Sequence, residues 1–206
     1  MQLIDLSHTI RDLMPVYPGD DPVQLEQTRD LEAHKHVNHC LVTGMHSGTH
    51  LDGPAHLLPS RIKISDLSLE HFLGRGCLLD VRSQPVVNWR REYDDLIQSG
   101  DIVLLYTGWD QYFEDKRYFE DGPVVEPTFA EQLVKKGVKM LGLDTPSPDQ
   151  PPFPVHKLLL GNGILILENL TNLGALLMAE RFEVMAFPLS LWADSSPVRV
   201  VARVDD

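Results

Sequence analysis

The chain has 206 residues, and its 18 basic and 30 acidic side chains give a formal net charge of −12. Hydrophobic residues (43%) and charged residues (23%) occur in globular proportions, which argues against disorder, and the negative charge opposes nucleic acid or anionic membranes as partners. No apolar run is long enough to span a bilayer and no signal peptide is visible, so we expect a soluble, cytoplasmic single domain over residues 1–206.

Short apolar runs rich in β-forming residues recur along the chain and predict strands. These runs cover residues 2–7, 38–43, 77–81, 102–106, 138–143, 164–167, 182–187 and 198–202. Helices are predicted over residues 88–99 and 127–136, because each periodic segment ends at a glycine. A strand follows each helix, which indicates βαβ units, an α/β fold class and a sheet that is at least partly parallel.

Five prolines between residues 144 and 154 exclude a regular helix or central strand there and predict a long, stiff loop. Functional sites are often carried by such loops. Asp144 opens this segment and is predicted either to cap a turn of the loop or to support a metal-bound histidine. The tryptophans, Trp89, Trp109 and Trp192, are predicted to be mainly core residues.

Histidines are concentrated in one short window. Six of the nine fall within residues 34–56, where even spacing would place about one. This clustering favours metal binding or proton transfer. His34, His36 and His39 lie in a mixed-charge stretch, so we expect them on a solvated loop or strand outside any site.

The second half of this window has the spacing of a metal site. Residues 46–56 read HSGTHLDGPAH. In an extended strand His50 and Asp52 face the same side, and the intervening glycines and proline let the chain bring His46 and His56 close. Two imidazoles and one carboxylate suit Zn²⁺ or Mn²⁺ and leave coordination positions open. The alternative is a turn with ordinary, hydrogen-bonded histidines.

Two further polar residues follow the proline-rich loop. Glu168 comes directly after the apolar run 164–167, where a carboxylate is buried only if it is paired or bound to metal. The alternative is a strand end that reaches solvent. His156 lies between the loop and this strand.

Residues 46–56 resemble the signature of the cyclase family of metal-dependent hydrolases, which includes formamidases and isatin hydrolases. Other blocks that resemble the family lie at residues 5–7, 14–20, 105–109, 142–147, 166–170, 188–189 and 196–199. The resemblance implies a β-rich mixed sheet in a swivelling β/β/α architecture and a homodimer or higher homo-oligomer.

The resemblance also implies a ligand set. In relatives that hold two metals, residues matching His156 and Glu168 complete the second site beside His46 and His50, and the aspartate matching Asp52 bridges both ions. Isatin hydrolase-like members hold one metal and carry glutamine at the glutamate position. Glu168 therefore favours two divalent ions per chain, Zn or Mn.

The resemblance assigns His56 a role in proton transfer, because its counterpart is not a ligand. An aromatic residue at the position of Tyr17 helps to wall the family's substrate pocket. Kynurenine formamidases tend to carry tryptophan at this place, so Tyr17 weakens the assignment of N-formylkynurenine as substrate.

The resulting hypothesis is a metal-dependent hydrolase that cleaves a carbon–nitrogen amide bond in a small molecule, with arylformamidase activity as the first specific expectation. The alternatives are hydrolysis of an isatin-like cyclic amide, a non-catalytic metal- or ligand-binding protein on the same scaffold, and a lyase or dehydratase in which the metal stabilises an enolate.

Overall fold

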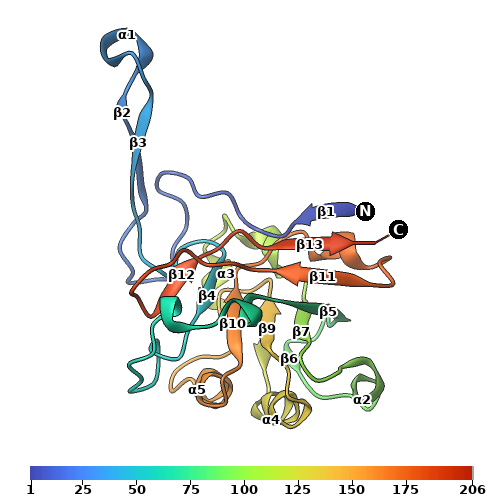
Figure 1. Cartoon of the computed structure of the whole chain (residues 1–206). Coiled ribbons are helices and arrows are strands. Elements are labelled where there is room, and N and C mark those ends of the chain that lie inside the picture. Colours follow the sequence, from blue (N-terminus) through green and yellow to red (C-terminus); the bar gives the residue numbers. More distant parts are fainter. Residues whose placement is uncertain (206) are drawn as a thin grey trace.

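The computed structural model describes residues 1–205, and a large mixed sheet lies at its centre (Figure 1). The sheet consists of β1 (Gln2–Asp5), β4 (His50–Asp52), β5 (Leu73–Asp80), β7 (Ile102–Tyr106), β9 (Met140–Leu143), β10 (Leu165–Glu168), β11 (Phe182–Met185), β12 (Ser195–Pro197) and β13 (Val201–Val204). Its strand order within the described residues is β1-β13-β11-β5-β7-β9-β10-β4-β12. The mixed α/β fold class is confirmed.

The middle of the sheet is parallel and its two sides are antiparallel. Strands β5, β7, β9 and β10 run in the same direction, as the βαβ pattern predicted. Strands β11, β13 and β1 extend one side, and β4 and β12 extend the other, with antiparallel pairing. The predicted strand at residues 102–106 coincides with β7, whereas other predicted strands shift by a few residues and the short β4 and β12 were not predicted.

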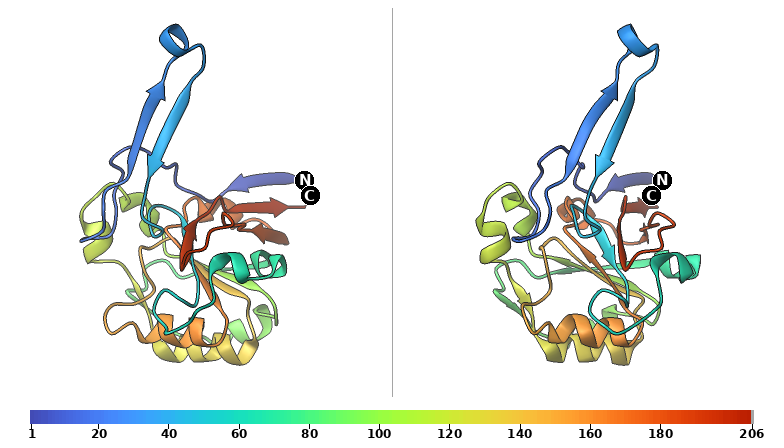
Figure 2. Two further views of the ribbon diagram at one scale, coloured as in Figure 1. Left: turned by 60° about the vertical axis from the view of Figure 1, so that its left-hand side comes forward. Right: turned by 90° about the vertical axis from the view of Figure 1, so that its left-hand side faces the viewer.

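Two helices cover one face of the sheet. Helix α4 (Pro127–Lys136) has the predicted bounds, since Pro127 opens its first turn and Gly137 ends it with a φ of 66°. Helix α5 (Pro154–Gly161) was not predicted, because its first residue is the last proline of the proline-rich run. Both helices lie side by side beneath the sheet (Figures 1 and 2).

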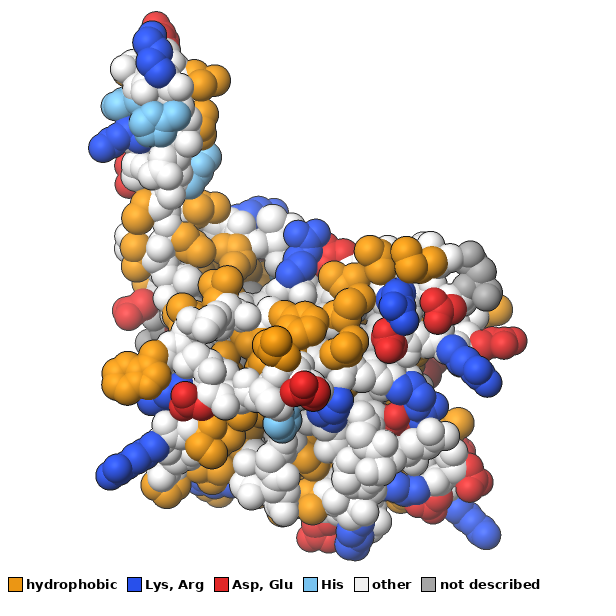
Figure 3. Space-filling model, viewed as in Figure 1, with side chains coloured by type: hydrophobic (Ala, Val, Ile, Leu, Met, Phe, Trp, Pro, Cys, Tyr) orange, Lys and Arg blue, Asp and Glu red, His pale blue; other side chains and the backbone are white. Residues whose placement is uncertain are grey.

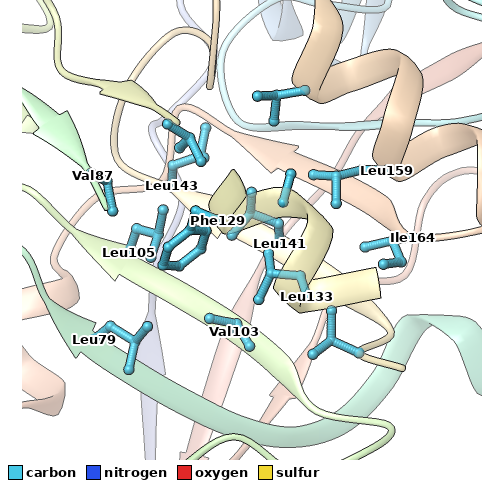
Figure 4. Packing of buried hydrophobic residues seen from close by; sticks show 14 of the residues in the cluster. Leu79, Val87, Val103, Leu105, Phe129, Leu133, Leu141, Leu143, Leu159 and Ile164 are labelled. Carbon is cyan, nitrogen blue, oxygen red and sulfur yellow. The ribbon is translucent and has the colours of Figure 1, made fainter. Parts of the chain in front are cut away.

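Strand β7 is buried on both faces, which explains its unbroken apolar sequence. Val103 and Leu105 face the helical layer and belong to the same cluster as Phe129 of α4 (Figure 4). Ile102 and Leu104 point the opposite way, into a second cluster covered by the antiparallel strands. Burial on both sides holds the central strands in place.

The predicted helix over residues 88–99 is wrong. Only α2 (Tyr93–Leu96) is helical, and Ile97 is already extended, with φ −86° and ψ 127°. The Asp101 carboxylate accepts a hydrogen bond from the Gln98 amide at 2.7 Å, which favours a turn over helix continuation. The periodic apolar residues Tyr93 and Ile97 still reach the core, but from a turn.

Several short elements complete the body. They are β6 (Val86–Val87), β8 (Val124–Val125), α3 (Arg117–Glu120), η1 (Ile64–Asp66), η2 (Leu69–Phe72), η3 (Trp109–Tyr112) and η4 (Leu173–Leu176). In the described part of the chain, no helix has the length and apolar character needed to cross a membrane.

A hairpin projects from the body. Strands β2 (Gln24–Arg29) and β3 (Asn38–Val42) pair antiparallel and are joined by α1 (Leu31–His34). Figure 2 shows this hairpin, residues 24–42, standing clear of the body in both of its views. We call it the arm.

The core prediction for the tryptophans holds for two of the three. Trp89 and Trp109 are half-buried and pack against hydrophobic clusters. Trp192 is 84% exposed, and its core assignment is wrong. It lies on the loop between β11 and β12, where Nζ of Lys63 is 5.9 Å from its ring centroid and none of the hydrophobic clusters of the described residues includes it.

Candidate metal centre

Two neighbouring strands bring the first three polar residues together. On β4, His50 and Asp52 point to the same side, as their spacing predicted, and Nε2 of His50 lies 3.5 Å from Oδ1 of Asp52. Strand β10 pairs with β4 so that Glu168 is directly opposite His50. Their side chains meet with Nε2 of His50 3.2 Å from Oε2 of Glu168. All three side chains are buried.

The turn before β4 adds His46. Gly48, with a φ of 62°, lets the chain reverse here, a conformation that favours glycine. Nδ1 of His46 then lies 2.9 Å from Oδ1 of Asp52. The carbonyl of Gly48 also accepts a hydrogen bond from the Asn169 side-chain amide at 2.9 Å, which ties this turn to the end of β10.

Helix α5 supplies the last of the predicted ligands. His156 lies in its first turns and is buried. Nε2 of His156 lies 3.1 Å from Oε1 of Glu168 and 3.6 Å from Oδ2 of Asp52. The Asp52 carboxylate is therefore the point where His46, His50 and His156 converge. The structure thus brings together the five residues predicted as ligands.

His46, His50 and His156 each have a further partner on the outer nitrogen of the ring, the one that faces away from Asp52 and Glu168. Nε2 of His46 lies 2.9 Å from Oδ2 of Asp194. Nδ1 of His156 bonds to the buried carboxylate of Asp149. Nδ1 of His50 bonds to the backbone carbonyl two residues earlier, at 2.8 Å. Metal-binding histidines are typically oriented in this way, with the inner nitrogen left for the ion.

Neither Asp149 nor Asp194, the two carboxylates that hold the outer histidine nitrogens, was predicted from the sequence. Asp149 lies in the proline-rich loop, seven residues before its histidine, but nothing in the sequence singles it out from Asp144. The structure places Asp144 elsewhere: its carboxylate accepts hydrogen bonds from the amides of Thr107 and Gly108 at 2.9 and 2.8 Å. Asp144 therefore neither caps its own loop nor supports a histidine.

Asp194 comes close to the site through backbone packing against Gly53. The Gly53 amide donates to the Asp194 carbonyl at 3.1 Å, and a Cβ on Gly53 would lie 2.5 Å from that oxygen. The glycine after Asp52 is therefore required for this approach. It places the Asp194 carboxylate beside both His46 and His56.

His56 lies at the edge of the cluster and is about a quarter exposed. Its Nδ1 is 3.6 Å from Oδ2 of Asp194, and its ring centroid is 4.0 Å from that of His46. Burial lowers the pKa of His56, so the ring is neutral near pH 7 and able to accept a proton. It is also near enough to His46 and Asp52 for all three to offer ligand atoms within 4.8 Å of one another.

The carboxylates and histidines of the cluster strongly shift one another's pKa values, in the direction that keeps the carboxylates negative and the histidines positive. Burial raises the pKa of Asp52, but the neighbouring histidines outweigh this and hold it well below its usual range. Burial lowers the pKa of His46, but hydrogen bonds and the charges of Asp52 and Asp194 raise it to about 9. Burial likewise lowers the pKa of His156, but Asp149, Asp52 and Glu168 raise it to about 12.

A divalent cation fits this donor set. Nε2 of His50 and Oδ2 of Asp52 are buried and make no hydrogen bond within the described residues, although Oε2 of Glu168 lies 3.2 Å from this nitrogen and Nε2 of His156 lies 3.6 Å from this oxygen. Buried polar atoms of this kind require an explanation, and a cation bound between them would satisfy both. His50, Asp52 and Glu168 form a second group of atoms within 4.8 Å, so Asp52 belongs to both groups.

A cavity of about 170 Å³ opens onto the cluster. Besides the histidines and Glu168, its wall includes the aromatic rings of Tyr17, Phe119 and Phe153. Tyr17 and Phe119 meet edge to face, with centroids 6.1 Å apart. Tyr17, which the family resemblance assigns to the wall of a substrate pocket, lines this cavity, and Phe119 and Phe153 were not predicted.

Comparison with known proteins identifies the family. A family model described as putative cyclase matches residues 4–150. A protein named kynurenine formamidase from Bacillus cytotoxicus is 31% identical over 205 residues, covering 97% of this chain and 96% of the relative. A protein of the same name from Salinibacter ruber is 34% identical over 215 residues, covering 98% of each.

Solved structures agree on the fold. Isatin hydrolase A from Labrenzia aggregata superposes with a TM-score of 0.86 at 22% identity, covering all of this chain and 94% of that one. A structure described as a potential metal-dependent hydrolase with cyclase activity gives a TM-score of 0.75 at 26% identity, covering 100% and 98%. With a family model matched over most of its length and full-length relatives above 30% identity, this chain belongs to the cyclase family and is a hydrolase of that family.

Proposed function

We propose that the chain hydrolyses the carbon–nitrogen bond of an amide with divalent metal ions held by His46, His50, Asp52, His156 and Glu168. The observation that carries the proposal is the pair of buried, unsatisfied atoms on His50 and Asp52, surrounded by ligand types that suit Zn²⁺ or Mn²⁺. Asp52 belongs to two groups of candidate ligand atoms, one with His46 and His56 and one with His50 and Glu168, and this overlap supports two ions per chain. His156 lies outside both groups and is included because its Nε2 is 3.1 Å from Oε1 of Glu168.

Ions bound at this position would supply Lewis acidity, which polarises a carbonyl oxygen and lowers the pKa of water from about 15.7 to roughly 7. His56 is neutral, partly exposed and on the cavity wall, so it can take a proton from the attacking water and return it to the leaving nitrogen. Asp194, 3.6 Å from its Nδ1, can hold the ring in position through both steps.

An arylformamide is the first substrate class to test. The relatives named kynurenine formamidase support it, and the aromatic wall formed by Tyr17, Phe119 and Phe153 suits a planar aryl group. The acyl carbonyl would then lie toward the histidine cluster, within reach of His56.

The test is formate release from N-formylkynurenine by protein that is first chelated and then reloaded with Zn²⁺ or Mn²⁺, with metal per chain counted in the same samples. The proposal expects turnover to disappear with the metal and to return with it. If metal binds but no formate is released, the metal site is supported and N-formylkynurenine is not the substrate.

A cyclic amide is the second candidate. The fold likeness to isatin hydrolases favours testing it. Tyr17 favours it as well, since the family resemblance associates tryptophan at this position with kynurenine formamidases. Isatin and formylkynurenine assayed side by side distinguish lactam opening from deformylation. Bound metal without turnover of any amide in such a panel would favour a non-catalytic binding protein, and loss of water from the product would favour a lyase.

A further inference from the structure

Asp20 is a charged residue of the cavity wall to which the proposed mechanism gives no role. It ends a tight turn over residues 17–20, in which the Asp20 amide donates to the Tyr17 carbonyl at 3.0 Å. Pro18 and Gly19 are the central residues of this turn, and Gly19 has a φ of 103°, a conformation that favours glycine. The turn therefore brings both Tyr17 and Asp20 to the wall of the same cavity.

Asp20 lies at the mouth of the cavity rather than at its floor. His50, His156 and Glu168 also line the cavity and are buried, so they form its floor. Asp20 is exposed to solvent. A substrate whose amide group lies at the metal ligands therefore presents its opposite end to Asp20.

The Asp20 carboxylate is free to interact with a ligand. Within the described part of the chain, no hydrogen bond or ion pair joins this carboxylate to another group. Elsewhere on the surface negative charges are often compensated, and Figure 3 shows acidic and basic side chains interspersed over the body. In a depression beside the cavity, Glu114 pairs with Arg11, and Glu120 pairs with Lys116 at 3.8 Å. Asp20 differs from these residues in having no basic partner.

The charges on the cavity wall favour a cation at the mouth. Among the described residues that line the cavity, none is a lysine or an arginine. Glu168 is a candidate metal ligand, and His56 is neutral near pH 7, so Asp20 supplies the charge that a substituent at the mouth meets. An ammonium group there would be attracted by Asp20, whereas a carboxylate would be repelled.

We propose that Asp20 selects amides that carry a positively charged group at the end remote from the scissile bond, and that it disfavours amides with a carboxylate there. This inference rests on the proposed amide hydrolysis and specifies its substrate class, an N-formyl arylamine with an ammonium substituent. Asp20 acts on substrate binding and not on proton transfer, because the group that it meets is at the other end of the substrate.

Three formanilides that differ in their para substituent test the proposal: 4-formamidobenzylammonium, 4-formamidobenzyl alcohol and 4-formamidophenylacetate. The ring holds the two groups at opposite ends, so a formyl group at the metal ligands leaves the substituent toward the mouth. In native protein loaded with Zn²⁺ or Mn²⁺, kcat/KM should be about 5-fold higher for the ammonium than for the alcohol, as expected for a solvent-exposed ion pair, and lowest for the carboxylate. High salt should reduce the difference, because it screens the charge of Asp20.

Variants of Asp20 should change this order. Asp20→Asn keeps the shape of the side chain but removes its charge, so the ratio of ammonium to alcohol should fall to about 1. Asp20→Lys should reverse the order and favour the carboxylate. Asp21→Asn is the matched control, because it removes a charge from the adjacent exposed residue, which does not line the cavity. It should keep the native ratio.

The same compounds distinguish failure of this inference from failure of the proposed function. If none is hydrolysed, their dissociation constants from metal-loaded protein, measured by calorimetry, supply the same ratios. A preference for the ammonium that Asp20→Asn removes would then support charge selection while rejecting hydrolysis of these amides. Hydrolysis without that preference, or with a preference that survives in Asp20→Asn or is lost in Asp21→Asn, would overturn the role of Asp20 and retain the proposed function. If no compound is hydrolysed or bound, both are rejected.

Discussion

The histidine-rich window of residues 34–56 is divided between two very different regions of the molecule. His34, His36 and His39 lie on the arm and are exposed. His46, His50 and His56 lie at or beside β4, and each is within about 4 Å of a carboxylate oxygen of Asp52 or Asp194. Residues of the same type, only a few positions apart, thus have different surroundings.

The difference shows that histidines alone do not define the candidate metal centre. What distinguishes it is that its histidines lie beside several carboxylates and are largely shielded from solvent. On the arm, His34 pairs with Asp30, four residues away, and that pair is exposed to water. In the centre the carboxylates come from β4, β10 and distant loops and are largely withdrawn from solvent. Only there do the rings present nitrogen atoms inward with their outer nitrogens already held.

Asp52→Asn should have the largest effect on the centre. The carboxylate contacts three histidine rings, and its replacement by an amide removes the charge that both ligand groups share. We expect metal affinity and amide turnover to fall by more than about 100-fold, beyond the loss typical of an outer partner. Metal content measured by mass spectrometry, together with turnover, checks this, and unchanged metal content would show that Asp52 is not a ligand.

His56→Ala should lower turnover by about 10²–10⁴-fold, the range expected for loss of a general acid–base group, while bound metal is retained. His39→Ala, on the arm, is the matched control and should change neither quantity. Loss of metal from His56→Ala would instead make His56 a ligand, an outcome that its closeness to His46 and Asp52 makes worth testing.

Asp149→Asn and Asp194→Asn should weaken metal binding by about 10–100-fold, because each carboxylate orients a histidine without facing the ion. The effect should be greater for Asp149, which is buried, than for Asp194, which is partly exposed. Competition titration with a chelating dye measures both. If both variants bind metal with the affinity of the native chain, Asp149 and Asp194 do not support the metal ligands.

The metal-free protein should lose stability as pH rises. The pKa of His46 in the folded chain, about 9, exceeds the unfolded value of 6.5, so its contribution is complete below pH 6.5 and is lost as pH passes through 9. The part of this loss that is due to His46 should be about 2 kcal/mol after allowance for partial exposure. Urea unfolding of chelated protein at pH 6 and pH 9.5 measures it.

His46→Gln should make this dependence less steep without removing it, because the pKa values of His50 and His156 are raised as well. His39→Gln should leave it unchanged. An equally steep dependence in the His46→Gln protein would show that other groups cause it. The smallest effect belongs to the arm: His36→Asn should alter the free energy of unfolding by no more than about 0.5 kcal/mol, as is usual for an exposed position, with metal content unchanged.

The sequence was informative wherever the relevant contacts are local. Two local features were predicted correctly. His50 and Asp52 point to the same side of their strand because they are two residues apart, and helix α4 begins at Pro127 and ends before Gly137. The outer partner of His46 is 148 positions away in the chain, so no local pattern could reveal Asp194. Helix α5 was not predicted because the prolines of residues 144–154 were taken to exclude a helix. Pro154 is nevertheless compatible with one, since proline is tolerated in the first turn, where its missing amide hydrogen costs nothing.

The most direct test of the central claim is the number of metal ions per chain in chelated and reloaded native protein, measured beside Asp52→Asn under the same conditions. We predict close to two Zn²⁺ or Mn²⁺ ions per native chain and far fewer in the variant. A native chain that binds no divalent ion at any step, or a variant that binds as many as the native chain, would contradict it.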